Sequence, residues 1–209
     1  MAQILSTADR ERIEATIAEL EQRTAAEFVV VNAEACANYY EVKLGYALLL
    51  AFGAGALAHT LWPDWGVPVI LWVQLAAAIA SMLACSIPAV LRRTVPRQLM
   101  QQHVEQRAEL AFLEHGVFAT RDRTGVLVLV SALEHRVALL GDEGIHKKLQ
   151  ESGWQRHVGE LAKSIKEGRA AQGVCDTLQA IGAVLIAEFP PRHDDTDELP
   201  NAVRDLRRP

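Results

Sequence analysis

The main feature of the hydrophobic pattern is an apolar block from Leu44 to Leu91, whose 48 residues contain one charged side chain, Asp64. The sequence WPDWG at 62–66 divides the block into apolar stretches of 18 and 25 residues, at 44–61 and 67–91. At 1.5 Å per residue, two helices would extend about 27 Å and 37 Å, comparable with a bilayer's hydrocarbon core. The pattern predicts a two-helix transmembrane hairpin. The alternative is a hairpin buried inside a soluble core.

The basic residues around this block predict its orientation. Lys43 precedes the first stretch, Arg92, Arg93 and Arg97 follow the second, and the WPDWG turn contains neither Lys nor Arg. Because basic residues concentrate on the cytoplasmic side of a membrane, we expect both termini in the cytoplasm and the turn outside. The sequence therefore predicts a multi-pass protein of a bacterial inner membrane.

The chain on either side of the block has the patterning of a soluble α/β domain. The segments 27–31, 126–130 and 136–140 each contain a continuous apolar run of at least four residues, which is typical of strands covered on both faces. Helical patterns precede and follow them, at 7–23, 97–114, 142–150, 154–167 and 171–189. We expect a small three-layer α/β sandwich formed by residues 1–43 and 92–190 and interrupted by the hairpin at 44–91. Residues 191–209 are expected to be a mobile charged tail, unless Leu199, Val203 and Leu206 dock on the domain.

Composition narrows the class of protein. The 209 residues are 50% hydrophobic and 22% charged with a net charge of −5, so neither a disordered chain nor a nucleic-acid-binding protein is expected. Cys36, Cys85 and Cys175 are widely separated, which argues against a zinc site or a disulfide framework. The N-terminal sequence lacks a basic region followed by an apolar one, so we expect no cleaved signal peptide.

Three motifs in the second half of the chain carry a family resemblance. They are RTGVLVLVS at 123–131, EHRV at 134–137 and DEGI at 142–145. With these motifs, residues 6–190 resemble the TPM domain family, which includes a thylakoid-lumen phosphatase and photosystem-repair proteins. Trp154, EGR at 167–169 and ELP at 198–200 resemble the membrane-anchored subgroup with a cytosolic domain.

The resemblance implies a TPM-like α/β fold and three activities: acid phosphatase, divalent-metal binding, or assistance in assembling membrane complexes. Lumenal and periplasmic members usually carry an acidic site after a GYGLE-like turn. The matching turn here reads Gly141-Asp142-Glu143-Gly144, so the glycine pattern departs from that of the family. Only the acidity of Asp142 and Glu143 carries over.

Few residues qualify as a site by their own chemistry. The sequence contains no Walker loop, HExxH or GxSxG motif. Asp142 and Glu143 are the candidate metal ligands, for Ca²⁺ or Mg²⁺, with the alternative that they only place charge at a helix start. Glu134 and His135 are either a proton-handling pair or a solvated turn. Four other histidines, His103, His115, His146 and His157, are expected at the surface, and Trp154 in the core.

The sequence therefore predicts an integral membrane protein that displays a TPM-like domain to the cytoplasm. Its expected role is that of a non-catalytic accessory, assembly or maintenance factor, with the bilayer and a membrane protein complex as partners. The alternative is a divalent-metal-dependent acid phosphatase using Asp142 and Glu143. A third hypothesis is a hairpin that forms homo-oligomers. Catalytic residues are not assigned, and no organic cofactor is expected.

Overall fold

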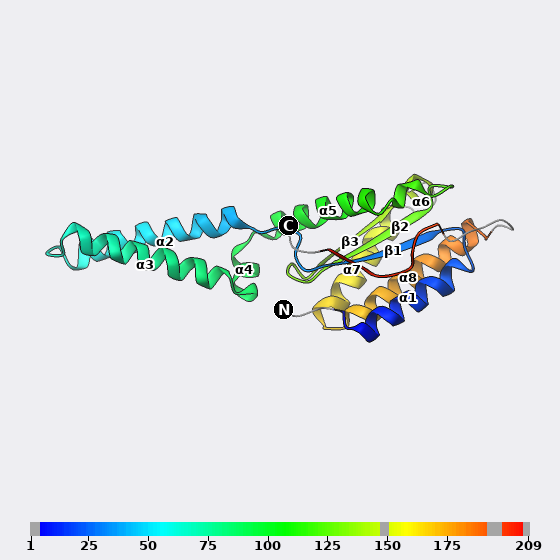
Figure 1. Ribbon diagram of the computed structural model, residues 1–209, viewed down its shortest axis with the longest axis horizontal. Helices are drawn as coiled ribbons and strands as arrows, with labels where there is room; N and C mark the ends of the chain where they lie inside the picture. Colours follow the sequence, from blue (N-terminus) through cyan, green and yellow to red (C-terminus); the bar gives the residue numbers. More distant parts are fainter. Residues whose placement is uncertain (1–4, 147–150, 192–197, 207–209) are drawn as a thin grey trace. The chain divides into compact units, whose positions relative to one another are not determined.

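A computed structural model describes residues 5–146, 151–191 and 198–206. Within these ranges it also describes the side chains, except those of residues 146–155. The chain forms two compact units, one from Met1–Ala37 with Gln101–Pro209 and the other from Asn38–Met100 (Figure 1). Each unit is described by itself. The second unit contains the whole apolar block that the hydrophobic pattern identifies.

A four-stranded sheet is the centre of the first unit. Its strands are β1 (Glu27–Ala33), β2 (Gly125–Ser131), β3 (Arg136–Gly141) and β4 (Arg204–Leu206), in the order β3-β2-β1-β4. β1 is parallel to both β2 and β4, and β2 is antiparallel to β3. Every residue of β1 and β2 is buried, as the continuous apolar runs predict.

Helices cover both faces of this sheet (Figure 1). Phe28 and Val30 point to the face packed by α1 (Thr7–Glu21), α7 (Glu151–Lys166) and α8 (Ala170–Glu188). Val29 and Val31 point to the opposite face, which packs against α5 (Arg97–Glu114). This alternation is the two-residue period of a strand, and it produces two separate apolar cores. The expected three-layer α/β sandwich is confirmed.

The segment from 198 to 206 differs from the mobile tail expected from its composition. β4 pairs with residues 31–33 of β1, and Arg10 makes a two-pronged ion pair with Asp205, at 2.6 and 2.8 Å. Asn32 Nδ2 also donates to Asp205, at 2.9 Å. Val203 and Leu206 are buried and Leu199 packs against the α5-side core, so the alternative of a docked tail holds for these residues.

The second unit is a helical hairpin formed by α2 (Tyr40–Leu61) and α3 (Val67–Cys85), followed by α4 (Pro88–Thr94). Gly55 of α2 faces Gln74 of α3 so closely that a Cβ on the glycine would lie 2.7 Å from Gln74 Cγ. A small residue at this position therefore allows the two helices to approach, and Trp62 and Trp65 stack at the turn.

The apolar stretch at 67–91 is not one helix, as the sequence suggests, but two. Ile87 is extended, with ψ of 121°, and separates α3 from α4. The cause is Pro88, because a proline disfavours helical backbone at the residue before it and suits the first turn of a new helix.

Among the described residues, three helices are long and apolar enough to cross a membrane: α2, α3 and α8. They differ in burial within the protein. About half of the most apolar stretch of α8 is buried, against 17% for α2 and 6% for α3.

The ion pair between Arg10 and Asp205 predicts how β4 responds to substitution. Asp205→Asn should weaken the docking of β4 by about 0.5–1 kcal/mol, since Asp205 is half-exposed and screened by solvent. Hydrogen exchange followed by mass spectrometry should show the peptide covering 198–206 exchanging about two- to five-fold faster at pH 7. Asp176→Asn, at an exposed position of α8, is the control and should leave that peptide unchanged.

The same contact predicts a dependence on pH. The hydrogen bond from Arg10 lowers the pKa of the Asp205 carboxyl below its ordinary value. The stabilisation is therefore fully present above about pH 4 and is lost as the pH falls through the lowered pKa of the folded state. Wild type and Asp205→Asn should converge as the pH falls below that lowered pKa. A difference that persisted undiminished there would contradict this assignment.

Candidate functional site

The acidic turn at Asp142 and Glu143 lies at the end of the sheet where β1 and β2 begin. β3 is antiparallel to β2, so Gly141 at the end of β3 pairs with Val126 near the start of β2. The short helix α6 (Glu143–His146) follows at once, as expected for the beginning of a helix at this position. The residues from 147 to 150, which complete the expected helix, lie outside the described residues.

Asp142 is buried and its carboxylate faces protein donors. Oδ1 accepts a 2.7 Å hydrogen bond from the backbone N–H of Glu143, and Oδ2 lies 3.2 Å from Nε of Arg123. Oδ2 is buried and makes no hydrogen bond of good geometry. Arg123 therefore compensates part of the negative charge of Asp142.

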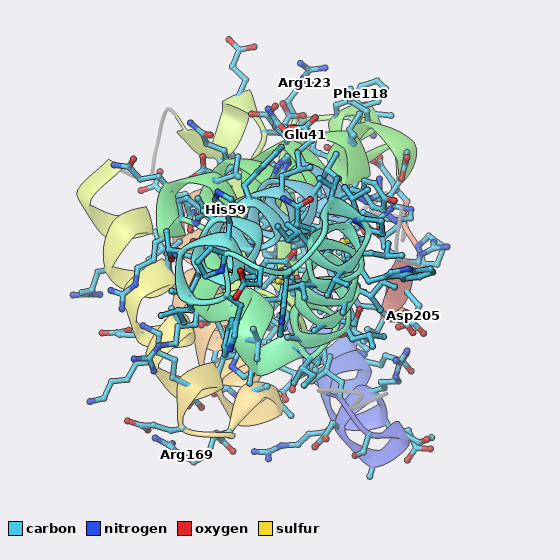
Figure 2. All side chains as sticks on the ribbon, turned by 90° about the vertical axis from the view of Figure 1, so that its left-hand side faces the viewer. Glu41, His59, Phe118, Arg123, Arg169 and Asp205 are labelled. Atoms are coloured by element: carbon cyan, nitrogen blue, oxygen red, sulfur yellow. The ribbon has the colours of Figure 1, made fainter. Side chains whose placement is uncertain are left out.

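The turn at 121–125 holds Arg123 in position. Arg123 has a positive φ of 58°, and its Nη1 donates to the carbonyl of Phe118, in the 3₁₀ helix η1 (Val117–Ala119), at 3.1 Å. Figure 2 shows the two side chains next to each other. The backbone of Gly144 bonds the carbonyl of Arg123, and a Cβ on Gly144 would lie 2.6 Å from that oxygen. Only a glycine at position 144 allows the acidic turn to pack this closely on the turn at 121–125.

The tail returns close to the same region. Glu198 Oε2 accepts from the backbone N–H of Arg121 at 2.9 Å, and the N–H groups of Glu198 and Leu199 donate to the buried carboxylate of Glu27. The acidic residues Asp194, Asp195 and Asp197, just before this segment, lie outside the described residues. Within the described part of the chain, no three His, Cys, Asp or Glu residues gather as metal ligands would.

A second polar cluster lies at the opposite end of the sheet, where β1 and β2 finish. Glu134 is only 4% exposed, so the interpretation of Glu134 and His135 as a solvated turn is wrong for Glu134. Its Oε1 accepts from the backbone N–H of Cys36 at 3.0 Å, and Oε2 accepts from the hydroxyl of Ser131. The position could have been found from the sequence, because the carboxyl ends of parallel strands meet at one edge of a sheet.

The Cys36 thiol in this cluster is not activated. Burial, and then the nearby charge of Glu134, raise the pKa of Cys36 to about 12. A nucleophilic cysteine needs a thiolate, which is stabilised by cationic neighbours rather than by a carboxylate. The carboxylate of Glu134 therefore fixes the end of β1, and the thiol beside it stays protonated.

Other residues singled out from the sequence are dispersed. His157 is buried rather than at the surface, with Nδ1 3.8 Å from Glu160. His115 is partly buried beside Glu114 at the end of α5. All three cysteines are free and buried. The side chains of His146 and Trp154 lie outside the described residues.

Comparison with known proteins identifies the domain. Residues 89–184, which extend from α4 into α8, match the family model of the TPM domain. The chain therefore carries a TPM domain, and the resemblance of the motifs at 123–131, 134–137 and 142–145 is confirmed. No match is found among curated proteins.

A solved structure has a similar fold. It is the NMR structure of the BA42 protein from the psychrophilic bacterium Bizionia argentinensis, with 18% sequence identity and a TM-score of 0.59. The similarity covers 97% of this chain and 95% of that one. At this identity the likeness concerns the fold alone.

The Glu134 cluster predicts the reactivity of Cys36. With its thiol protonated and buried, Cys36 should resist alkylation by iodoacetamide at pH 8 in the folded protein. Glu134→Gln removes the nearby negative charge, lowers the pKa of the thiol and should raise the alkylation rate several-fold. Mass spectrometry of the Cys36 peptide measures the rate. Cys175, buried in the other apolar core, reports general unfolding and should stay unmodified; equal acceleration at both cysteines would contradict the prediction.

Proposed function

We propose that this protein is anchored in the cytoplasmic membrane by the α2–α3 hairpin and presents its TPM domain to the cytoplasm as a non-catalytic assembly or maintenance factor for a membrane complex. The observation that carries the proposal is the exposure of large apolar side chains along α2 and α3. Leu49 is 66% exposed, and Phe52 and Trp72 are each 70% exposed. A soluble surface rarely carries so continuous an apolar area.

α8 is apolar for a different reason. Its residues Val174, Leu178, Ile181 and Leu185 are fully buried in the core beneath the sheet. A helix whose apolar face is already packed by its own domain has no comparable surface for lipid. This contrast supports two spans, α2 and α3, rather than three.

The charges around the hairpin support the orientation. Lys43 lies in the first turn of α2, and Arg92 and Arg93 lie in the last turn of α4, while the turn between α2 and α3 carries Asp64 alone. By the positive-inside rule, the ends of the hairpin and both termini face the cytoplasm.

The chemistry of the polar clusters supports an accessory role. Among the described side chains, Asp142 is ion-paired with Arg123, and the thiol of Cys36 is held protonated. Interaction of the TPM domain with another membrane protein requires neither of them to react. The proposed partner is thus a membrane protein complex reached from the cytoplasmic side.

Labelling with a membrane-impermeant maleimide tests the anchor and its orientation. The three native cysteines are buried, so Asp64→Cys adds one accessible thiol at the turn, and Asp176→Cys adds one on the exposed side of α8. In intact bacterial cells Asp64→Cys should be labelled and Asp176→Cys should not, and both should react after the membrane is permeabilised. Labelling of Asp176→Cys in intact cells, or release of the protein by alkaline carbonate, would overturn the proposed topology.

The accessory role is tested by chemical cross-linking in native membranes followed by purification of the full chain. We expect one membrane protein complex to be recovered reproducibly with the wild type. A variant whose α2–α3 hairpin is replaced by an unrelated two-span hairpin should recover the same complex if the TPM domain makes the contact. Loss of the complex in this variant would assign the contact to the hairpin instead.

A metal-dependent phosphatase is the second candidate, favoured by the buried and incompletely hydrogen-bonded Oδ2 of Asp142 next to Glu143. Two carboxylates in one turn could contribute to a Ca²⁺ or Mg²⁺ site if further oxygen ligands converged on it. Arg123 opposes this function, because its positively charged side chain lies 3.2 Å from the same oxygen and would repel a cation there.

Phosphate release from a chromogenic ester, from pH 4 to 9 with Ca²⁺ or Mg²⁺, separates the two functions. The detergent-purified wild type should show no metal-dependent turnover. In calorimetry, the wild type and the Asp142→Asn, Glu143→Gln double variant should give the same heat on addition of the metal. The control is Glu160→Gln, at a surface position of α7. Turnover that the double variant loses and the control keeps would overturn the non-catalytic proposal.

A further inference from the structure

On the α5 side of the domain, three basic side chains each have a buried nitrogen that makes no hydrogen bond. They are Arg107 in α5, His115 directly after α5, and Arg204 in β4. Nε of both arginines and Nε2 of His115 are buried and make no hydrogen bond. Buried donors are nearly always satisfied, so three such nitrogens in one part of a domain require an explanation.

The fold brings these residues together although they are far apart in sequence. Arg204 and Leu206 are two residues apart in β4 and therefore point to the same face of the sheet. Leu206 packs on that face with Ala108 and Ala111 of α5, the neighbours of Arg107 and His115 along the helix. The side chain of Arg204 thus lies in the α5 layer.

The electrostatics of His115 are consistent with this arrangement. Burial, and then the positive charge of Arg204, lower the pKa of His115 below its ordinary value, with a smaller contribution in the same direction from Arg107. Glu114 acts in the opposite direction. His115 therefore lies within electrostatic reach of both guanidinium groups.

The positive charge of this cluster is only partly compensated. Glu114 approaches Nη1 of Arg107 with both oxygens, at 3.3 and 3.4 Å, and its side chain is half-exposed. Arg204 has neither an ion pair nor a side-chain hydrogen bond within the described part of the chain. Within the described residues, one long ion pair therefore serves two guanidinium groups, in a protein whose net charge is −5.

We propose that Arg107, His115 and Arg204 form a binding site for a phosphate group. A guanidinium presents its donors in a planar fork that matches two oxygens of a phosphate, and two forks with one imidazole donor suit a tetrahedral oxyanion. The phosphate belongs either to a free phosphate compound or to a lipid headgroup. The site uses no residue of the acidic turn and depends neither on the accessory role nor on phosphatase activity.

The test uses the full chain in detergent, with inorganic phosphate as the probe. The chemical shift of the His115 ring, followed by NMR with labelled histidine, should titrate with phosphate, and the pKa of His115 should rise because the bound anion stabilises the imidazolium. Arg204→Gln and Arg107→Gln should each weaken binding at least tenfold. Arg156→Gln, at an exposed position of α7, should bind as the wild type does.

The conservative variants and the choice of anion exclude a simple salt effect. Arg204→Lys keeps the charge but loses the fork, so it should bind better than Arg204→Gln and less well than the wild type. Chloride at the same ionic strength should not shift the His115 signal. Equal responses to chloride and phosphate, or equal phosphate affinities in the wild type and Arg204→Gln, would overturn the proposal.

Nanodiscs distinguish the two sources of the phosphate. If the ligand is a headgroup, nanodiscs containing phosphatidic acid should shift the His115 signal and those containing only phosphatidylcholine should not. If it is a free compound, added inorganic phosphate should produce the shift in either nanodisc, and phosphatidic acid without added phosphate should not. Either pattern supports the site, and no shift with any of these probes rules it out.

Discussion

The parallel pairing of β1 with β2 is the contact on which the rest of the domain depends. It runs over all seven residues of β1, from Glu27 opposite Gly125 to Ala33 opposite Ser131. Both strands are buried on both faces, so each requires a helical layer on either side. Parallel strands also need a crossover connection, and here that connection contains the entire helical hairpin as well as α5.

The pairing also decides which residues meet at each end of the sheet. Cys36, Ser131 and Glu134 meet where β1 and β2 finish, and this carboxylate satisfies a backbone N–H just after β1. Asp142 and Arg123 meet at the other end, since β3 runs back along β2. The two polar clusters are therefore separated by the length of the strands and cannot form one site.

Much of the fold could be predicted from local sequence because the decisive signals are local. Continuous apolar runs identify β1, β2 and β3, and their lack of alternation implies two covering layers. β4 gives no such signal, since its three residues Arg204–Leu206 include two charged side chains. It is held by Arg10 and Asn32, and Glu14 accepts from Val203 just before it; all three lie more than 170 residues earlier in the chain. No local pattern can reveal such contacts.

The candidate sites also depend on contacts that a local sequence pattern does not reveal. Asp142 and Glu143 stand out because two adjacent acids open a helix, but their electrostatics depend on Arg123, held by a left-handed turn. The burial of Glu134 depends on two strand ends lying side by side. Arg107, His115 and Arg204 share no motif, and only the docking of β4 on the sheet brings the last of them to α5.

The position of β1 ahead of the hairpin has a consequence for the synthesis of the protein. β1 leaves the ribosome before the hairpin, and both of its neighbours in the sheet are made after the hairpin. During that interval a strand with a long apolar run has two unpaired edges, the condition that promotes pairing between different chains. The interval lasts until the hairpin, α5 and β2 have been translated, so correct folding of the domain is tied to the timing of translation.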